Sequence, residues 1–263
     1  MAKKRISLSV STTNGAVRQN NEDNFSINGR GLPSGKSIIN INGTADADTM
    51  LLAVFDGMGG EEMGEVASAI ASRLSGDLLR RLNVSEEADY PNVVNEYVDA
   101  ANTEICRALS NDGSKRGGTT MALVYLKNGI AYPFSLGDSR IYLLAGGSLV
   151  QISEDHTLAM RKYKANIYTL EEAEMSSDSH KLTLFLGVDV DGNGLEAQWY
   201  DPFSLRQGSK LLICSDGLYD MLSRDEIHDI LMNCHENTAD ELAAAAFRNG
   251  GIDNITCIVA QYV

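Results

Sequence analysis

The chain has 263 residues, of which 43% are hydrophobic, and a formal net charge of −14 at pH 7. This proportion of apolar residues supports a sizeable folded core and excludes a largely disordered chain. The strong negative charge repels nucleic acid and anionic lipid, so we expect neither nucleic acid nor a membrane as a partner.

The first third of the chain contains short apolar runs followed by two long amphipathic segments. The short runs predict strands at Arg5–Ser11, Asn24–Ile27, Ile38–Ile41 and Met50–Phe55. In the long segments apolar residues recur every three or four positions, which predicts helices at about Glu61–Leu82 and Pro91–Leu109.

A β meander is predicted next. Thr119–Leu126 turns at Asn128-Gly129 into Ile130–Ser135, and Arg140–Leu144 turns at Gly146-Gly147 into Leu149–Ile152. Short glycine-containing turns between apolar runs are typical of hairpins, so these strands should pair in antiparallel fashion.

The pattern fades between Asp155 and His180 and then resumes. Capping boxes, in which a Ser or Thr is followed three residues later by Glu, predict helix starts at Thr169, Ser223 and Thr238. Further strands are expected at Leu182–Leu186, Glu196–Tyr200, Lys210–Cys214 and Ile255–Val263.

Strands and helices therefore come in groups and do not alternate. This grouping predicts an α+β fold in which two antiparallel sheets form a β-sandwich with helix pairs on the outside. Residues 1–263 contain no long linker, charge block or repeat, so we expect a single domain.

The compartment is inferred from the lack of a signal peptide, a membrane span and a CxxC motif in the sequence. No stretch has the length of a signal peptide's apolar core or of a membrane span. The four cysteines lie in apolar patterns and form no CxxC motif, which predicts small core residues in a reducing compartment. We expect a cytoplasmic protein, and a monomer.

Acidic residues recur where predicted strands begin or end. Asp56, Asp138 and Asp216 follow apolar runs, whereas Glu22-Asp23 and Asp253 precede them. Carboxylates from strand ends at one sheet edge would repel one another unless cations neutralise them, and oxygen ligands suit Mg²⁺ or Mn²⁺. Any single Asp-Gly pair is equally well explained as a turn, so the pattern alone leaves a metal site and a set of turns both open.

The order of short motifs along the chain decides between these interpretations. RQNNED, DGMGG, GGTT, GDSR, DH, LG, SDGL and DNIT occur in this order between Arg18 and Val259. Together they resemble the PP2C (PPM) family of metal-dependent Ser/Thr protein phosphatases, and the methionine in DGMGG resembles its bacterial branch. The resemblance implies the family's αββα sandwich and hydrolysis of phosphoserine and phosphothreonine by a water activated at two Mn²⁺ or Mg²⁺ ions.

The resemblance also assigns roles residue by residue. Asp56 matches the bridging ligand, assisted by the Gly57 carbonyl; Asp216 and Asp253 match ligands of the first ion and Glu22 a ligand of the second. Asp138, with Asp216, matches the ligands of a third, weaker ion.

Two further residues match groups that act without ligating. Asp23 matches an acid that holds water bound to the ions, and Arg18 matches the arginine that grips the substrate phosphate. The implied partners are phosphoproteins and a Ser/Thr kinase whose action the phosphatase opposes.

The chain departs from the family pattern at two places. Met58 stands where many eukaryotic members have a histidine. Ser179 and Leu184 occupy positions near the end of the flap, residues 157–182, where bacterial members usually carry arginines. These departures keep two alternatives open: a phosphatase-like binding or scaffold protein with an idle site, and a regulator that dephosphorylates an anti-sigma antagonist.

Overall fold

The computed structural model describes residues 5–33, 36–46, 48–59, 63–110, 117–188 and 194–263. Two antiparallel sheets form its centre. The first, sheet A, has the strand order β10-β9-β13-β14-β1-β3, and the second, sheet B, has the order β11-β8-β7-β4-β2 with β12 also paired to β8. The predicted α+β sandwich is confirmed.

The strand bounds follow the predicted runs closely in most cases. Sheet A comprises β1 (Arg5–Thr13), β3 (Ile39–Asp46), β9 (Arg140–Ala145), β10 (Ser148–Gln151), β13 (Lys210–Cys214) and β14 (Ile255–Tyr262). Sheet B comprises β2 (Asn24–Ile27), β4 (Thr49–Phe55), β7 (Met121–Lys127), β8 (Ile130–Leu136), β11 (Gln198–Trp199) and β12 (Phe203–Ser204). Two short strands, β5 (Gly57–Gly59) and β6 (Gly117–Thr119), pair with each other.

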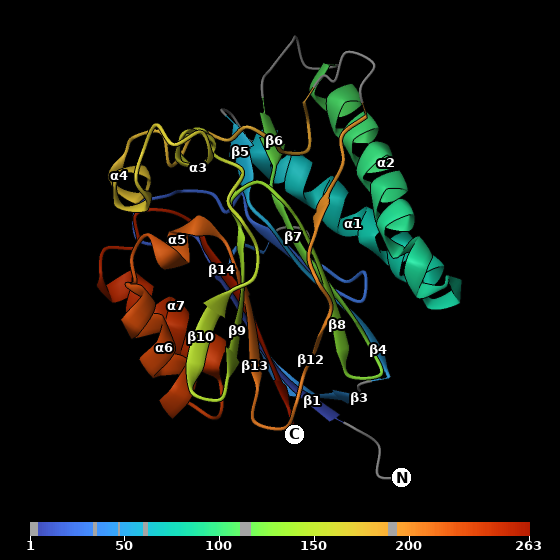
Figure 1. Ribbon diagram of the computed structural model, residues 1–263, viewed down its shortest axis with the longest axis vertical. Coiled ribbons are helices and arrows are strands. Elements are labelled where there is room, and N and C mark those ends of the chain that lie inside the picture. The colour runs from blue at the N-terminus through green and yellow to red at the C-terminus, as the bar shows by residue number, and fades with distance from the viewer. Residues whose placement is uncertain (1–4, 34–35, 47, 60–62, 111–116, 189–193) are drawn as a thin grey trace.

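Helices cover both outer faces of the sandwich, as Figure 1 shows. The long helices α1 (Met63–Val84) and α2 (Tyr90–Ser110), joined by the short 3-10 turn Glu87–Asp89, pack on sheet B. The short helix α5 (Asp216–Tyr219) and the helices α6 (Arg224–Asn233) and α7 (Thr238–Arg248) pack on sheet A. A third apolar layer, which includes Leu52, Val124 and Ile258, lies between the sheets.

Strand pairing explains why distant acids meet. In sheet B the end of β4 pairs with the start of β2, and the end of β8 pairs with the start of β7. In sheet A the end of β13 pairs with the start of β14, whose first residue Ile255 also faces Thr13 at the end of β1. In an antiparallel sheet, the end of one strand lies beside the start of the neighbouring strand. The loops that carry the predicted acids leave the two sheets at such points.

Of three predictions about the second half of the chain, one was wrong and two are confirmed only in part. Leu182–Leu186 is not a strand, because only its two end residues form isolated bridges, to Thr157 and Thr119. The expected strand Glu196–Tyr200 shortens to β11. Helix α7 does begin at Thr238, but its N-cap is Asn237 in the left-handed conformation, with no side-chain cap.

The other two capping boxes are confirmed. Thr169 and Glu172 cap α4 (Leu170–Met175), and Ser223 and Glu226 cap α6. Helix α4 follows α3 (Leu158–Lys164), and both belong to the flap, which lies beside α5 and β5 in Figure 1. Residues 61 and 62 of the predicted first helix lie outside the described residues. Within the described ranges no helix is long and apolar enough to cross a membrane.

The layer between the sheets should carry much of the stability. Val124 is fully buried there, whereas Val84 at the end of α1 is 86% exposed. We expect Val124→Ala to lower the free energy of unfolding by about 2 kcal/mol, because two buried methyl groups are lost and a cavity remains. The matched Val84→Ala should change it by less than about 0.5 kcal/mol. Urea denaturation of both variants measures the difference, and equal effects would contradict this assignment of the core.

Candidate metal centre

Asp56 and Asp216 form the middle of the acidic cluster. Asp56 follows β4 directly, and Asp216 is the first residue of α5, two residues after β13. The two carboxyl groups share a hydrogen bond. Burial, together with the charges of neighbouring acids, raises the pKa of Asp56 well above its ordinary value and that of Asp216 to about 6. Both shifts favour the protonated form, so ionising the pair is costly where cations are absent.

Asp23 lies behind this pair and is almost completely buried, with 2% of its surface exposed. Its carboxylate accepts a hydrogen bond from Ser215 Oγ at 2.8 Å and a second one from the side chain of Thr256. Burial raises the pKa of Asp23 to about 7, and the two hydrogen bonds oppose the shift without cancelling it. The side chain is thus held firmly in place and is easily protonated.

Glu22 is packed closely against two glycines, Gly57 and Gly64. A Cβ on Gly57 would lie 2.3 Å from the Glu22 carbonyl oxygen, and a Cβ on Gly64 would lie 2.8 Å from Glu22 Oε2. Only glycine leaves room for this approach. Burial raises the pKa of Glu22, and the charge of Arg18 opposes that shift.

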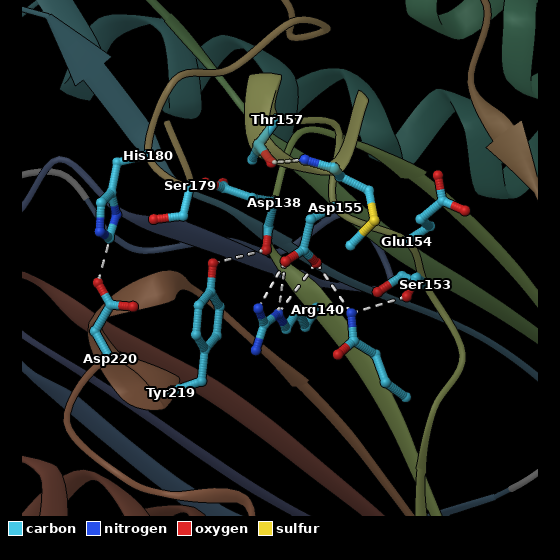
Figure 2. A network of polar contacts seen from close by, with 12 residues as sticks. Asp138, Arg140, Ser153, Glu154, Asp155, Thr157, Ser179, His180, Tyr219 and Asp220 are labelled. Carbon is cyan, nitrogen blue, oxygen red and sulfur yellow. Dashed lines mark hydrogen bonds and ion pairs between the residues drawn. The ribbon is translucent and has the colours of Figure 1, made fainter. Parts of the chain in front are cut away.

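Asp138 is supported by the polar network drawn in Figure 2. The Tyr219 hydroxyl donates to the Asp138 carbonyl oxygen at 3.0 Å, and the Tyr219 ring packs against the Arg140 guanidinium at 3.6 Å. Arg140 in turn forms a bidentate ion pair with Asp155, in which Nε donates to Oδ1 and Nη2 donates to Oδ2. Burial and the charge of Asp216 raise the pKa of Asp138 well above its ordinary value.

The residue before Asp138 is fixed by His156. The Gly137 N–H donates to His156 Nδ1 at 3.0 Å, and the His156 N–H donates to the Gly137 carbonyl at 2.9 Å. His156 Nε2 is occupied by Gln198 Oε1 at 2.7 Å. Both ring nitrogens of His156 are therefore occupied, which gives this residue a structural role at the start of the flap.

Arg18 and Asp253 form the outer rim of the cluster. Arg18 Nη2 lies 2.7 Å from Asp253 Oδ2, and the two side chains remain 54% and 37% exposed. This hydrogen bond and the charge of Asp253 raise the pKa of Arg18. An exposed ion pair is weak, so the guanidinium can exchange this carboxylate for another anion at little cost.

The structure brings all eight predicted site residues together at one end of the sandwich. The charge of Asp56 interacts with those of Asp216, Asp23 and Asp138; Asp216 also interacts with Asp253, and Asp253 with Glu22. Arg18 pairs with Asp253, and Gly57 touches Glu22.

Sequence reasoning missed several residues that hold these groups. Asn254 Oδ1 accepts from the Glu22 N–H at 2.8 Å, and its amide donates to the carbonyls of Asn14 and Asn20. Asn254 lies in the DNIT motif, so a signal was present. Tyr219 and Asp155 gave no comparable signal, because their roles depend on contacts between segments far apart in the sequence.

The donor set fits hard divalent cations. It consists of carboxylates and a backbone carbonyl, with no cysteine or histidine among the eight residues, which is the chemistry that Mg²⁺ and Mn²⁺ prefer. Burial first, and then the charges of neighbouring acids, raise the pKa values of Asp23, Asp56 and Asp138, so their ionised forms lack compensating positive charge. Cations would supply the missing charge.

Comparisons with known proteins place the chain in a family. Residues 41–248 match the family model described as protein phosphatase 2C. The protein phosphatase PhpP of Streptococcus pneumoniae is 31% identical over 95% of this chain and 95% of its own length. The serine/threonine phosphatase stp of Listeria monocytogenes is 29% identical, with 95% and 93% covered. The serine/threonine protein phosphatase PstP of Mycobacterium tuberculosis is 30% identical over 95% of this chain, which spans only 43% of that relative's length.

Solved structures give the same result. The crystal structure of M. tuberculosis PstP/Ppp superposes with a TM-score of 0.79 at 28% identity, covering 98% of both chains. The PstP catalytic domain in complex with two manganese ions superposes with a TM-score of 0.76 at 29% identity, covering 99% of both chains. With a family model that matches most of its length, the chain belongs to the protein phosphatase 2C family of serine/threonine phosphatases.

Proposed function

We propose that this chain, as one phosphatase domain, hydrolyses phosphoserine and phosphothreonine in proteins at a centre that holds two Mn²⁺ or Mg²⁺ ions, and that it opposes a Ser/Thr kinase in the cytoplasm. The observation that carries the proposal is the convergence of Asp56, Asp216, Asp253 and Glu22 at one edge of the sandwich. The manganese-containing PstP structure supports the choice of metal.

Each acid has a proposed part in holding the ions. Asp56 would bridge them with help from the Gly57 carbonyl, Asp216 and Asp253 would complete the first position, and Glu22 would ligate at the second. When bound, such ions would lower the pKa of a water shared between them and neutralise charge on the phosphate. Asp138, beside Asp216, would contribute to a third and weaker position.

Two residues would act on water and substrate. Asp23 is buried and held by Ser215, so its carboxylate can accept a proton or a hydrogen bond from water without moving. Arg18 is exposed at the rim, where its guanidinium can turn from Asp253 to a phosphate and bind two of its oxygens. The rigid acid would orient the water, and the exposed arginine would orient the phosphate.

Hydrolysis should depend on the ions and on Asp56. We expect steady release of phosphate from a phosphoserine peptide in Mn²⁺ and none in EDTA. Asp56→Asn should lower kcat/KM by more than about 100-fold, because mutating a residue that only supports a metal ligand already lowers metal affinity or activity by about 10–100-fold. Asp229→Asn is the matched control, since Asp229 is an exposed acid on α6. Tight peptide binding without turnover in Mn²⁺ would favour the scaffold alternative instead.

Arg18 should act mainly on substrate binding. We expect Arg18→Lys to raise KM for a phosphopeptide by about 10-fold or more while kcat changes less, because lysine keeps the charge but loses the bidentate contact. Arg248→Lys, which changes an exposed ion pair with Glu241, should leave both constants unchanged. An unchanged KM in Arg18→Lys would remove Arg18 from the phosphate site.

The raised pKa values predict how the stability of the metal-free protein depends on pH. Asp23 has a pKa of about 7 in the folded protein against 3.8 ordinarily, so the folded state binds more protons than the unfolded state between these values. The free energy of unfolding contributed by Asp23 is therefore fully present below about pH 4 and is lost as pH rises through about 7.

Ions should reverse this loss, because they bind the deprotonated acids. In EDTA we expect Tm to fall as pH rises from about 5 to 8, with a shallower fall in Asp23→Asn. Mn²⁺ should raise Tm most at the upper end of this range. Thermal unfolding at several pH values measures both effects. An equal Mn²⁺-induced rise in Tm for wild type and Asp56→Asn would contradict the proposed ligand set.

A further inference from the structure

Exposed apolar side chains flank the ion pair of Arg18 and Asp253. Val17 directly precedes Arg18 and is 65% exposed, and Ile252 directly precedes Asp253 and is 57% exposed. Phe247, in the last turn of α7, is 47% exposed. Single apolar residues are common on protein surfaces and need no explanation, but three that gather beside one exposed arginine indicate a contact surface.

The loop before Arg18 and the loop before Asp253 are in direct backbone contact. The Ala16 N–H donates to the Gly251 carbonyl oxygen at 2.7 Å. A Cβ on Gly15 would lie only 2.1 Å from the Asp253 carbonyl oxygen, so no side chain separates the two loops there. The exposed side chains that precede Arg18 and Asp253 therefore extend from one continuous piece of surface.

Two further apolar side chains border the second loop. A Cβ on Gly250 would lie 3.6 Å from Met221 Sδ and 3.8 Å from Ile252 Cγ1, so both of these side chains flank this glycine. A Cβ on Gly251 would lie 3.3 Å from the Phe247 Cα, which places the end of α7 against the loop. We call this surface the apolar rim; it comprises Val17, Met221, Phe247 and Ile252.

The apolar rim continues directly from the proposed phosphate site. Neighbouring Cα atoms of a peptide are about 3.8 Å apart, so a residue beside a phosphorylated serine comes close to the rim when Arg18 binds the phosphate. An apolar side chain at that position would leave water as it covers the rim, whereas a polar one would lose hydration. The net charge of −14 opposes association with a second copy of the chain, so a phosphopeptide is the better occupant.

We propose that the apolar rim binds an apolar side chain next to the phosphorylated serine or threonine, and so selects phosphoproteins that carry such a residue. This inference rests on the proposed function, because it takes Arg18 as the group that positions the phosphate. The rim residues have no part in holding ions or in the hydrolytic step. They determine which phosphorylated sequence is held while Arg18 holds the phosphate.

Peptide binding tests this selectivity without turnover. Two fluorescent peptides carry a phosphonate analogue of phosphoserine, which is not hydrolysed, flanked on both sides by leucine in one and by asparagine, of similar size, in the other. In Mn²⁺ we expect the leucine peptide to bind about 5-fold more tightly by fluorescence anisotropy, because it buries apolar surface on the rim. Ile252→Ser and Val17→Ser should each lower this ratio, and the double variant should bring it close to one.

Val84→Ser provides the matched control. Val84 is 86% exposed at the end of α1, so its replacement should leave the preference for the leucine peptide as in wild type. Equal binding of the two peptides by wild type, or a preference that persists in the double variant, would overturn the proposal. A concentration-dependent dimer in sedimentation velocity that Ile252→Ser abolishes would assign the rim to a second copy and overturn it as well.

Hydrolysis of a phosphoserine peptide in Mn²⁺ reports separately on the proposed function. Turnover without a preference for leucine would keep the function and remove the role of the rim. A preference for leucine without turnover would keep the rim as a phosphopeptide-binding surface and remove the function.

Discussion

The crowding of carboxylates at one edge of the sandwich is the constraint on which the site depends. Asp23, Asp56 and Asp138 lose hydration there and repel one another, so their pKa values rise. Such a cluster is costly unless protons or cations neutralise it. The burial of three apolar layers stabilises the fold and offsets this cost, and the same layers fix where the strands end. Because cations relieve this repulsion, the same crowding gives the cluster its affinity for them.

The sheets and the surrounding polar contacts have separate tasks. Strand register decides which acids share an edge, but it leaves the side chains and loops free to move. Asn254 fixes the Glu22 backbone, Ser215 fixes the Asp23 carboxylate, and Tyr219 fixes the Asp138 carbonyl. A ligand set held by such contacts loses less conformational entropy when ions bind, which strengthens binding without any additional ligand.

Local patterns sufficed for most strands and for the acids themselves. Met50–Phe55 is apolar because both faces of β4 are buried, and Asp56 is recognisable because it interrupts that run. Leu182–Leu186 looks equally apolar, yet it pairs only at its ends, because the flap fixes its path. The contact of Tyr219 with Asp138 joins residues 81 positions apart. No short-range pattern encodes such a contact, so the supporting network could not be predicted.

Two buried aspartates show how surroundings separate a structural acid from an acid of the proposed metal centre. Asp23 and Asp178 both expose little surface, 2% and 7%, but Asp23 lies deep in the protein whereas Asp178 lies close to its surface. Hydrogen bonds from Lys162 and Lys181 lower the pKa of Asp178 to about 2, whereas that of Asp23 rises to about 7. Asp178 has its cations within the flap and serves to fix it. Asp23 faces other acids and two hydroxyl groups, so the positive charge that its ionised form requires must come from outside the chain.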